Sequence, residues 1–197
     1  MAKGPKYKRS LRRRNEGKTD YHKRLKLLKS RKLRVTIRAT NNHIRVQFIE
    51  STIGGDKILI SAFSKELPLK YNWDANTGNI PAAYLTGYLA GIRAKSKKIQ
   101  EAIFDLGILY HRNRVLAACK GVIDSGINIP YREEFFPNNL EDRIKGSHIE
   151  NYAKVLKSNE PEKYDQIFSG YLNKKKVNPL KIGQLFSNSL KIIKNKS

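Results

Sequence analysis

The sequence predicts an α/β domain in which a mixed sheet packs against helices, with elements in the order β-β-β-α-β-α. Three observations support this prediction. Residues 33–63 alternate β-branched and polar side chains, as strands do, and residues 80–98 repeat apolar side chains at helical spacing. A short apolar stretch at 102–106 then precedes a second helical pattern at 113–126. Because a strand that follows a crossover helix pairs in parallel with a neighbour, the sheet should be mixed.

The first three strands are expected to form an antiparallel meander. They cover residues 33–39, 43–49 and 57–63. Asn41 and Asn42 suit the first turn because Asn tolerates positive φ, and residues 54–56, Gly-Gly-Asp, mark the second turn.

The alternation also assigns the two faces of this sheet. Val35 and Ile37 should face the core, since residues two apart share a face. The opposite face then carries mostly cationic and polar side chains: Arg34, Thr36, Arg38, Arg45 and Gln47. One face of the sheet is therefore expected to be basic.

The first helix of the domain should begin near Ile80 or Pro81, after a linker over residues 66–79. Gly87 and Gly91 lie one turn apart and offer a flat strip, which we expect to pack closely on the sheet. In the second helix, Cys119 is expected to be a small core side chain, because no nearby His or second Cys would activate it.

Beyond Pro130 the pattern is helical, with three further helices expected at 148–158, 162–172 and 179–194. They could pack on the domain or on a partner, and the sequence leaves both open. The chain is accordingly divided into three parts: a basic arm with a short helix (1–32), the α/β domain (33–130) and a helical extension with a basic tail (131–197).

Charge separates the ends of the chain from its middle. The chain has 40 Lys and Arg against 17 Asp and Glu, for a net charge of +23. Residues 1–38 hold 16 of the cations and two of the acids, whereas residues 39–150 are nearly neutral. Such a basic arm indicates a polyanionic partner. A single cysteine excludes an intramolecular disulfide, and no apolar stretch is long enough for a membrane span.

The arm interleaves aromatic side chains with its cations. Tyr7 and Tyr21 can stack on unpaired bases, while the Arg run at 12–14 can pair with phosphates, so RNA is favoured over a membrane. Asp20 is expected to cap a short helix from Tyr21 to about Lys29. The alternative is a solvated charge run or a nuclear localisation signal.

The sequence shows no motif for catalysis, metal binding or a cofactor. Its four histidines lack metal-ligand spacing, and its glycine stretches lack the spacing of a phosphate-binding loop. A two-metal nuclease would need converging carboxylates, for which the candidates are Glu50, Asp74, Asp105 and Asp124. We expect these to be surface charges or partners of arginines. A metal-dependent RNA-processing enzyme and a nonspecific RNA chaperone remain the alternatives to a specific RNA-binding protein.

Several pieces of the chain, in order and with matching spacing, closely resemble the universal L18 family, the archaeal and eukaryotic-type large-subunit ribosomal protein that binds 5S rRNA. They include RRRNEGKTDYHKRLKLLKS, ATNNHIRVQF, NTGNIPAAYLTGYLAGIRA, AIFDLGI, RVLAACKGVIDSGINIP and RIKGSHIENYA. The resemblance runs from about residue 3 to residue 157. The tail after about residue 158 has no piece that matches.

The resemblance implies a structural, non-enzymatic constituent of the cytoplasmic ribosome that anchors 5S rRNA in the central protuberance of the large subunit. Its implied partners are 5S rRNA, large-subunit rRNA and neighbouring ribosomal proteins, with no cofactor and no membrane. The implied fold is the α/β type called translational-machinery components. A homo-oligomer is not expected, because nothing in the sequence indicates a self-complementary face.

The resemblance also implies which residues contact RNA. In the arm they are Tyr7, Lys8, Arg9, Arg12, Arg13, Arg14, Lys18, Thr19, Tyr21, His22, Lys23 and Arg24. In the first hairpin they are Asn41, Asn42, His43 and Arg45. The sequence LYHRNRV departs from the longer archaeal loop, so Tyr110, His111 and Arg112 are either RNA contacts or part of a plain strand-to-helix loop.

Overall fold

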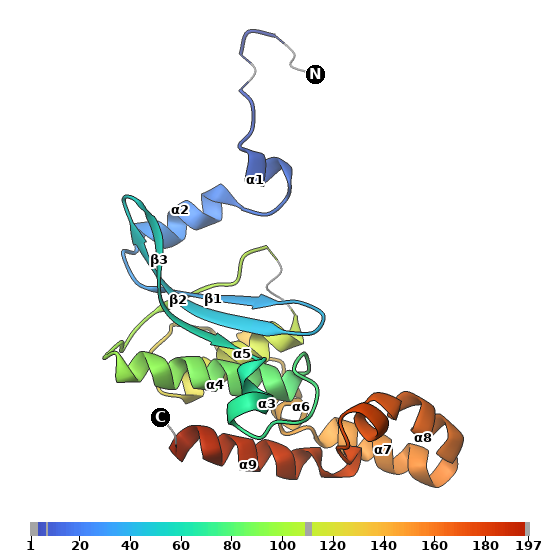
Figure 1. Ribbon diagram of the computed structural model, residues 1–197. Helices are drawn as coiled ribbons and strands as arrows, with labels where there is room; N and C mark the ends of the chain where they lie inside the picture. The colour runs from blue at the N-terminus through green and yellow to red at the C-terminus, as the bar shows by residue number, and fades with distance from the viewer. Residues whose placement is uncertain (1–3, 7, 109–111, 196–197) are drawn as a thin grey trace.

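The computed structural model describes residues 4–6, 8–108 and 112–195, and its elements are arranged in layers (Figure 1). A sheet lies in the middle, with the short helix α2 (Tyr21–Lys29) above it. Helices α4 (Ile80–Ser96) and α5 (Asn113–Asp124) cover the opposite face, and α9 (Ile182–Asn195) lies beyond α4. The order β-β-β-α-β-α predicted for the domain is confirmed.

The described residues form a four-stranded sheet in the order β3-β2-β1-β4. Its strands are β1 (Arg34–Ala39), β2 (Ile44–Thr52), β3 (Gly55–Phe63) and β4 (Ile103–Asp105). β1 and β2 pair antiparallel, as do β2 and β3, whereas β1 and β4 are parallel. The sheet is therefore mixed, as the crossover through α4 predicts.

The core forms between the sheet and the two helices beneath it. Val35 and Ile37 of β1 are buried and lie opposite Phe48 and Val46 of β2 in the antiparallel register. Cys119 of α5 is also buried, and this burial raises the pKa of its thiol. The burial of Val35 and Ile37 confirms the prediction that their face of the sheet is turned toward the core, and the burial of Cys119 confirms that it is a core side chain.

The glycine strip of α4 packs on a helix, not on the sheet as expected. A Cβ added at Gly87 would overlap the backbone of Ala118, and one at Gly91 would overlap the side chain of Ser125. Gly121 of α5 lies equally close to the backbone of Tyr84. Small residues on both helices thus allow a close approach of α4 and α5. Sequence spacing identifies a flat strip but does not identify what it contacts.

The predicted linker over 66–79 is partly helical, which corrects the expectation. Helix α3 (Glu66–Lys70) forms there because Glu66 accepts a hydrogen bond from the backbone N–H of Phe63 and pairs with Arg93 at 2.6 Å. Leu67 is completely buried. A short helix held by tertiary contacts leaves little periodic signal in the sequence.

The two hairpin turns lie where predicted but differ in detail. Neither Asn41 nor Asn42 has a positive φ, so their tolerance of that conformation is not used. In the second hairpin the turn lies at Ile53 and Gly54, and Asp56 belongs to β3. Asp56 is therefore a residue of β3, paired with Ser51 of β2, and not a turn residue as predicted.

The residues after 130 form a series of helices. They are η1 (Glu133–Phe135), α6 (Leu140–Lys145), α7 (Ser147–Asn159), α8 (Pro161–Ile167), η2 (Gly170–Lys174) and η3 (Pro179–Lys181), followed by α9. The helix expected over 162–172 is divided into α8 and η2, a π-helical turn. Buried apolar residues of α6 and α9 join the main core, while α7 and α8 form a small cluster of their own.

The N-terminal arm extends away from the body above the sheet (Figure 1). It contains α1 (Arg12–Asn15) and α2, and neither helix buries a residue. Among the helices that the structure describes, none is long and apolar enough to cross a bilayer.

Candidate nucleic-acid interface

Helix α2 forms where the sequence predicts it, directly after Asp20. The Asp20 carboxylate accepts hydrogen bonds from the backbone N–H groups of His22 and Lys23, at 3.0 and 3.1 Å. The bond from Lys23 contributes most to holding the pKa of Asp20 below its usual range. A capped first turn fixes the direction in which α2 leaves the arm.

A network of ion pairs fastens α2 to the sheet. Both carboxylate oxygens of Asp56 accept hydrogen bonds from Arg24, each at 2.9 Å. Arg34 of β1 pairs with Asp56 and with Asp105, each at 2.8 Å, and also donates to the hydroxyl of Ser51. Partial burial acts to raise the pKa of Asp56, but hydrogen bonds from Arg24 and Arg34 outweigh it and lower that pKa. The arm therefore has a fixed root.

This network corrects the expectation of a basic sheet face. Arg34 is only 1% exposed and Thr36 is buried, so neither can contact a ligand on that face. Two carboxylates compensate the guanidinium of Arg34, as a buried charge requires. At the other end of β1, Arg38 remains exposed, as does Arg45 directly across the hairpin. The cationic part of the face is thus confined to one end of the sheet.

A cleft of about 450 Å³ lies between the arm and the sheet. Its lining combines candidate residues of the arm with residues of the sheet and the segment after β4: Arg13, Lys18, Thr19, Asp20, Tyr21, Lys23, Arg24, Leu27, Arg38, Asp56, Asp105, Gly107 and Ile108. Lys23 Nζ donates to the carbonyl of Gly107 at 3.3 Å, which joins α2 to that segment. Since Arg34 pairs with Asp56 and Asp105, the two acids that the sheet contributes to this lining, the outer lining is mainly cationic.

The arm before α2 exposes its charge. Lys8, Arg9 and the three arginines of α1 are all exposed, and Arg13 donates to the hydroxyl of Thr19 at 2.9 Å. Glu16 pairs with Lys18 at 2.8 Å and with Arg12 at 3.5 Å. Such exposed pairs contribute little stability and exchange readily for phosphate. Tyr7 lies outside the described residues.

The hairpin between β1 and β2 is held through its backbone, which leaves the Asn41 and Asn42 side chains exposed. Arg114 of α5 donates to the carbonyls of Thr40 and Asn41 at 2.7 and 3.2 Å. Thr77 donates its hydroxyl to the carbonyl of Asn42 at 2.8 Å. The hairpin is therefore rigidly placed while its two amide side chains can hydrogen-bond a partner.

His43 and Arg45 both pack against the aromatic ring of Phe63. The ring centroids of His43 and Phe63 are 5.0 Å apart, and the Arg45 guanidinium lies 5.1 Å from the Phe63 centroid. His43 Nδ1 is 3.1 Å from the hydroxyl of Thr77. This arrangement fixes an exposed guanidinium beside the hairpin, which suits a phosphate or a base edge.

The structure separates the candidate residues into groups. Six of the predicted arm contacts line the cleft, while five described ones do not: Lys8, Arg9, Arg12, Arg14 and His22. Asn41, Asn42, His43 and Arg45 lie at the far end of β1. Sequence reasoning did not single out Arg38 or Arg114. Arg38 is the described cation that joins the groups, because it lines the cleft and lies directly across from Arg45. The alternation of β1 correctly placed Arg38 on the sheet face opposite the core. No sequence signal indicates that Arg114 donates hydrogen bonds to the hairpin backbone.

The loop after β4 is described only at its ends. Tyr110 and His111 lie outside the described residues, and Arg112 is exposed immediately before α5.

Two of the four acids weighed as metal ligands have other partners in the structure. Asp105 is the last residue of β4 and pairs with Arg34, and Asp124 pairs with Lys120 and accepts a hydrogen bond from Tyr84. In the described part of the chain, no three His, Cys, Asp or Glu side chains gather as metal ligands. These acids are therefore partners of cations and of one tyrosine.

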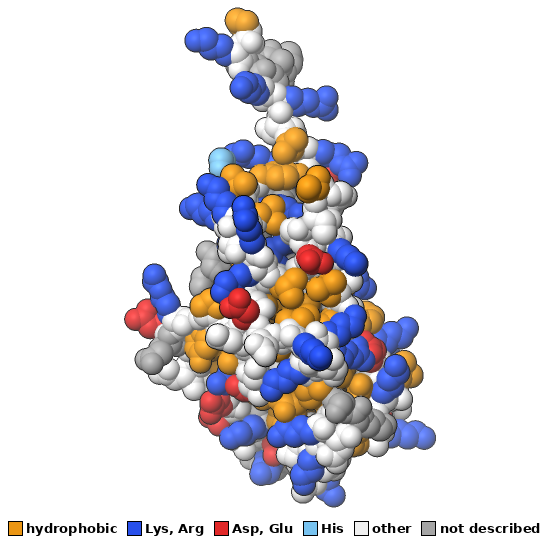
Figure 2. All heavy atoms as spheres, turned by 90° about the vertical axis from the view of Figure 1, so that its left-hand side faces the viewer, with side chains coloured by type: hydrophobic (Ala, Val, Ile, Leu, Met, Phe, Trp, Pro, Cys, Tyr) orange, Lys and Arg blue, Asp and Glu red, His pale blue; other side chains and the backbone are white. Residues whose placement is uncertain are grey.

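Figure 2 shows Lys and Arg side chains over the arm and the upper part of the molecule, where few Asp or Glu side chains lie. A surface of this kind attracts a polyanion and positions it through backbone phosphates. The rigid hairpin and the ring-backed Arg45 add hydrogen-bond donors with defined positions.

Comparison with known proteins agrees with this chemistry. Residues 5–106 match the family described as ribosomal large subunit proteins 60S L5 and 50S L18. The large ribosomal subunit protein uL18 of Korarchaeum cryptofilum is 48% identical over 195 residues, covering 98% of this chain and 97% of that protein. The uL18 of Aeropyrum pernix is 44% identical over 178 residues, covering 88% of this chain and 81% of that protein.

Proposed function

Because the chain belongs to the family of large-subunit ribosomal proteins 60S L5 and 50S L18, we propose that it binds 5S rRNA and anchors this RNA in the central protuberance. The chain is a large-subunit ribosomal protein, a structural constituent and not an enzyme. Its partners are accordingly rRNA and other ribosomal proteins.

One observation supports RNA binding most directly. The arm keeps its cations exposed, while Asp20 and Arg24 fix its root on the sheet. An arm fixed at one end can follow an RNA backbone outward from a defined starting point. Its phosphate contacts set position, and bases that are not paired can stack on its aromatic side chains.

The hairpin provides the second part of the proposed interface. Asn41, Asn42 and Arg45 present donors and acceptors at the opposite end of β1 from the root of α2. Two contact regions held at a fixed distance recognise the shape of a folded RNA rather than a short sequence. Shape recognition distinguishes this proposal from a nonspecific RNA chaperone, which would bind any RNA equally well.

Competition binding tests the proposal. Labelled 5S rRNA is titrated with the full chain in the presence of excess transfer RNA, over a series of salt concentrations. Two variants accompany it: a deletion of residues 1–19, which leaves α2 and its ion pairs in place, and the replacement of Arg12, Arg13 and Arg14 by Gln. The matched control replaces three exposed lysines of the C-terminal region by Gln: Lys157, Lys174 and Lys176.

The full chain should prefer 5S rRNA, and the deletion should lose most of the affinity. Since each neutralised phosphate contributes about −0.7 to the slope of log K against log salt, the triple Arg variant should flatten that slope by about 2. The lysine control should change the slope much less. Equal competition by transfer RNA would contradict the proposal of 5S rRNA specificity.

A further inference from the structure

Two cationic segments meet at the edge where β1 and β4 begin. The strands are parallel, with Arg34 opposite Ile103, and the N–H of Ile103 donates to the carbonyl of Leu33 at 2.9 Å. Parallel strands start at the same edge of a sheet, so the residues that enter β1 and β4 lie side by side. Lys32 confirms this, because its Nζ lies 2.7 Å from the carboxylate of Glu101.

Each of these segments begins with a cation in the left-handed backbone region. Arg31 follows the cap of α2 with a φ of 52°, and Lys98 follows the cap of α4 with a φ of 58°. This position after a helix most often holds Gly, because a side chain there is strained. The chain places Arg and Lys at two positions where Gly would be more stable. A strained residue of this kind is grounds for a functional hypothesis.

The helix dipole does not account for these two cations. A positive charge near a helix C-terminus is favourable, but α2 already has Lys26 and Lys29 in its last turn, and α4 has Lys95. Those lysines have ordinary helical backbone. Placing further charge at Arg31 and Lys98 therefore adds strain without being needed for the helix ends.

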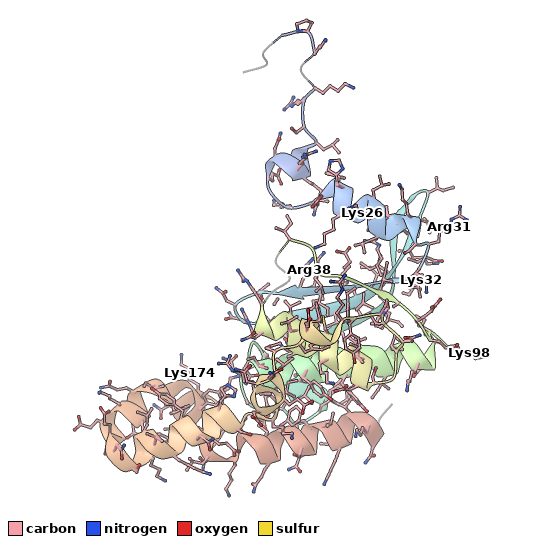
Figure 3. The ribbon with its side chains drawn as sticks, turned by 180° about the vertical axis from the view of Figure 1, so that it is seen from behind. Lys26, Arg31, Lys32, Arg38, Lys98 and Lys174 are labelled. Atoms are coloured by element: carbon pink, nitrogen blue, oxygen red, sulfur yellow. The ribbon has the colours of Figure 1, made fainter. Side chains whose placement is uncertain are left out.

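Both side chains are available to a partner. Arg31 and Lys98 are exposed, and neither has a side-chain hydrogen bond or ion pair to another described residue. Figure 3 shows Arg31 beside the end of α2, with Lys32 and Lys98 below it along the same edge of the molecule. Lys26, which is exposed on α2, connects this edge with the arm. We call Arg31, Lys32 and Lys98 the edge strip.

We infer that the edge strip is a further phosphate-binding surface, which contacts the backbone of the same RNA that the arm binds. The inference rests on the proposed function for the identity of that RNA. It extends the interface beyond the arm and the hairpin, to the opposite end of β1 from Asn41 and Asn42.

An RNA backbone fits this strip better than an acidic protein does. Interfaces between proteins are depleted of Lys and rely on buried aromatic or aliphatic anchors. The strip consists of exposed cations, two of them ammonium groups on rotatable stems and one a guanidinium, which suits a row of phosphates. Its continuity with Lys26 and the arm favours one polyanion that follows both.

The test uses substitutions that remove charge without harming the fold. In the full chain, Arg31→Gly and Lys98→Gly together remove two cations and relieve two left-handed side chains. A second double variant, Arg31→Gln with Lys98→Gln, removes the same charge but keeps the strain. The matched control is Lys176→Gly with Lys191→Gln, because Lys176 has a φ of 52° and both lysines are exposed on the C-terminal region.

Binding to labelled 5S rRNA is measured from low to high salt. Both edge-strip variants should flatten the salt slope by about 1.4, at about 0.7 for each of two phosphate contacts, and the control should not. The melting temperature of the Gly double variant should equal that of the unchanged chain or exceed it by roughly 2–4 °C. An affinity that falls while stability holds separates loss of contact from loss of folding.

Two outcomes would overturn the inference. One is a salt slope unchanged in both edge-strip variants, which would also be seen if the strip bound an acidic protein. The other is an equal change in the control, which would show an effect of net charge alone. The proposed function is judged separately, by whether the unchanged chain prefers 5S rRNA over transfer RNA.

Discussion

The two ends of the chain are both basic, yet the structure uses them differently. The N-terminal arm buries no residue in either of its helices, whereas α6 and α9 at the other end supply buried side chains to the main core. Lysine content does not separate the two regions. The burial of apolar side chains does, because a helix joins a core only when its apolar face packs against other elements.

Helix α9 presents such a face. Ile182, Phe186, Ser189 and Ile193 are buried and recur every three or four residues. Helix α2 has leucines at similar spacing, but Leu25 is 54% exposed and none of its residues is buried. Helix α2 is held instead by hydrogen bonds and ion pairs to Asp56 and to the carbonyl of Gly107.

The difference shows how a basic protein can present charge without losing stability. Cations of the arm extend toward a partner from a polar attachment, and the C-terminal helices stabilise the body by burial. We therefore expect substitutions in the C-terminal helices to affect unfolding and substitutions in the arm to affect RNA binding.

The largest effect should come from truncating the core side of α9. Ile193 is fully buried, so Ile193→Ala should lower the free energy of unfolding by about 2–5 kcal/mol, measured by urea denaturation. Leu25→Ala in α2 is the matched control and should cost no more than about 0.5 kcal/mol, as exposed sites do. Similar losses in the two variants would remove the distinction between the regions.

The next effect concerns the attachment of α2. Asp56→Asn removes the charge that Arg24 and Arg34 share, and leaves the buried Arg34 with Asp105 as its one remaining carboxylate partner among the described residues. We expect a loss of about 1–3 kcal/mol, because a buried donor then lacks part of its compensation. Amide exchange should increase in α2 and stay slow in α9. Unchanged exchange in α2 would mean that Asp56 does not hold the arm.

Much of the fold could be predicted because its signals are local. Alternation located the three strands of the meander, helical periodicity located α4, α5, α7 and α9, and Asp20 marked the start of α2. Each of these signals depends on residues close together in the chain, and the physical rule behind each is short in range.

What the sequence could not show depends on contacts between distant residues. The alternation of β1 put Arg34 and Arg38 on one face, but it could not show that Arg34 is buried between Asp56 and Asp105, whereas Arg38 stays exposed with a longer pair to Asp105 at 3.6 Å. The spacing of Gly87 and Gly91 did not reveal α5 as their neighbour. Arg38 was likewise not predicted as an RNA contact, because only the folded structure shows that it lies between the arm and the hairpin.

A smaller effect should follow from the polar contact of the C-terminal region with the loop before α4. Lys175 Nζ donates to the carbonyl of Ala75 at 2.6 Å, and burial lowers the pKa of this lysine. Lys175→Met should therefore cost about 0.5–1.5 kcal/mol in urea denaturation. Lys174→Met is the control, since the exposed Lys174 side chain has no charge partner among the described residues, and this substitution should leave the free energy of unfolding unchanged. Equal effects would show that the contact with Ala75 does not matter.

The smallest effect should be a pH dependence confined to the attachment of the arm. The folded-state pKa of Asp56 lies below its ordinary value of 3.8, because hydrogen bonds from Arg24 and Arg34 outweigh burial. The charged Asp56 carboxylate therefore contributes its full stabilisation of the folded state well above pH 3.8. This contribution is lost as the pH falls through the folded-state pKa. At a pH equal to the unfolded-state pKa of Asp56, the loss of this stabilisation is at most RT ln 2, or about 0.4 kcal/mol.

The difference in the free energy of unfolding between the unchanged chain and Asp56→Asn should therefore narrow by up to this amount between pH 7 and that pH. Because Asp20 and Glu66 titrate equally in both proteins, the difference isolates Asp56. A gap that widens on acidification would show that Asp56 does not stabilise the arm through its charge.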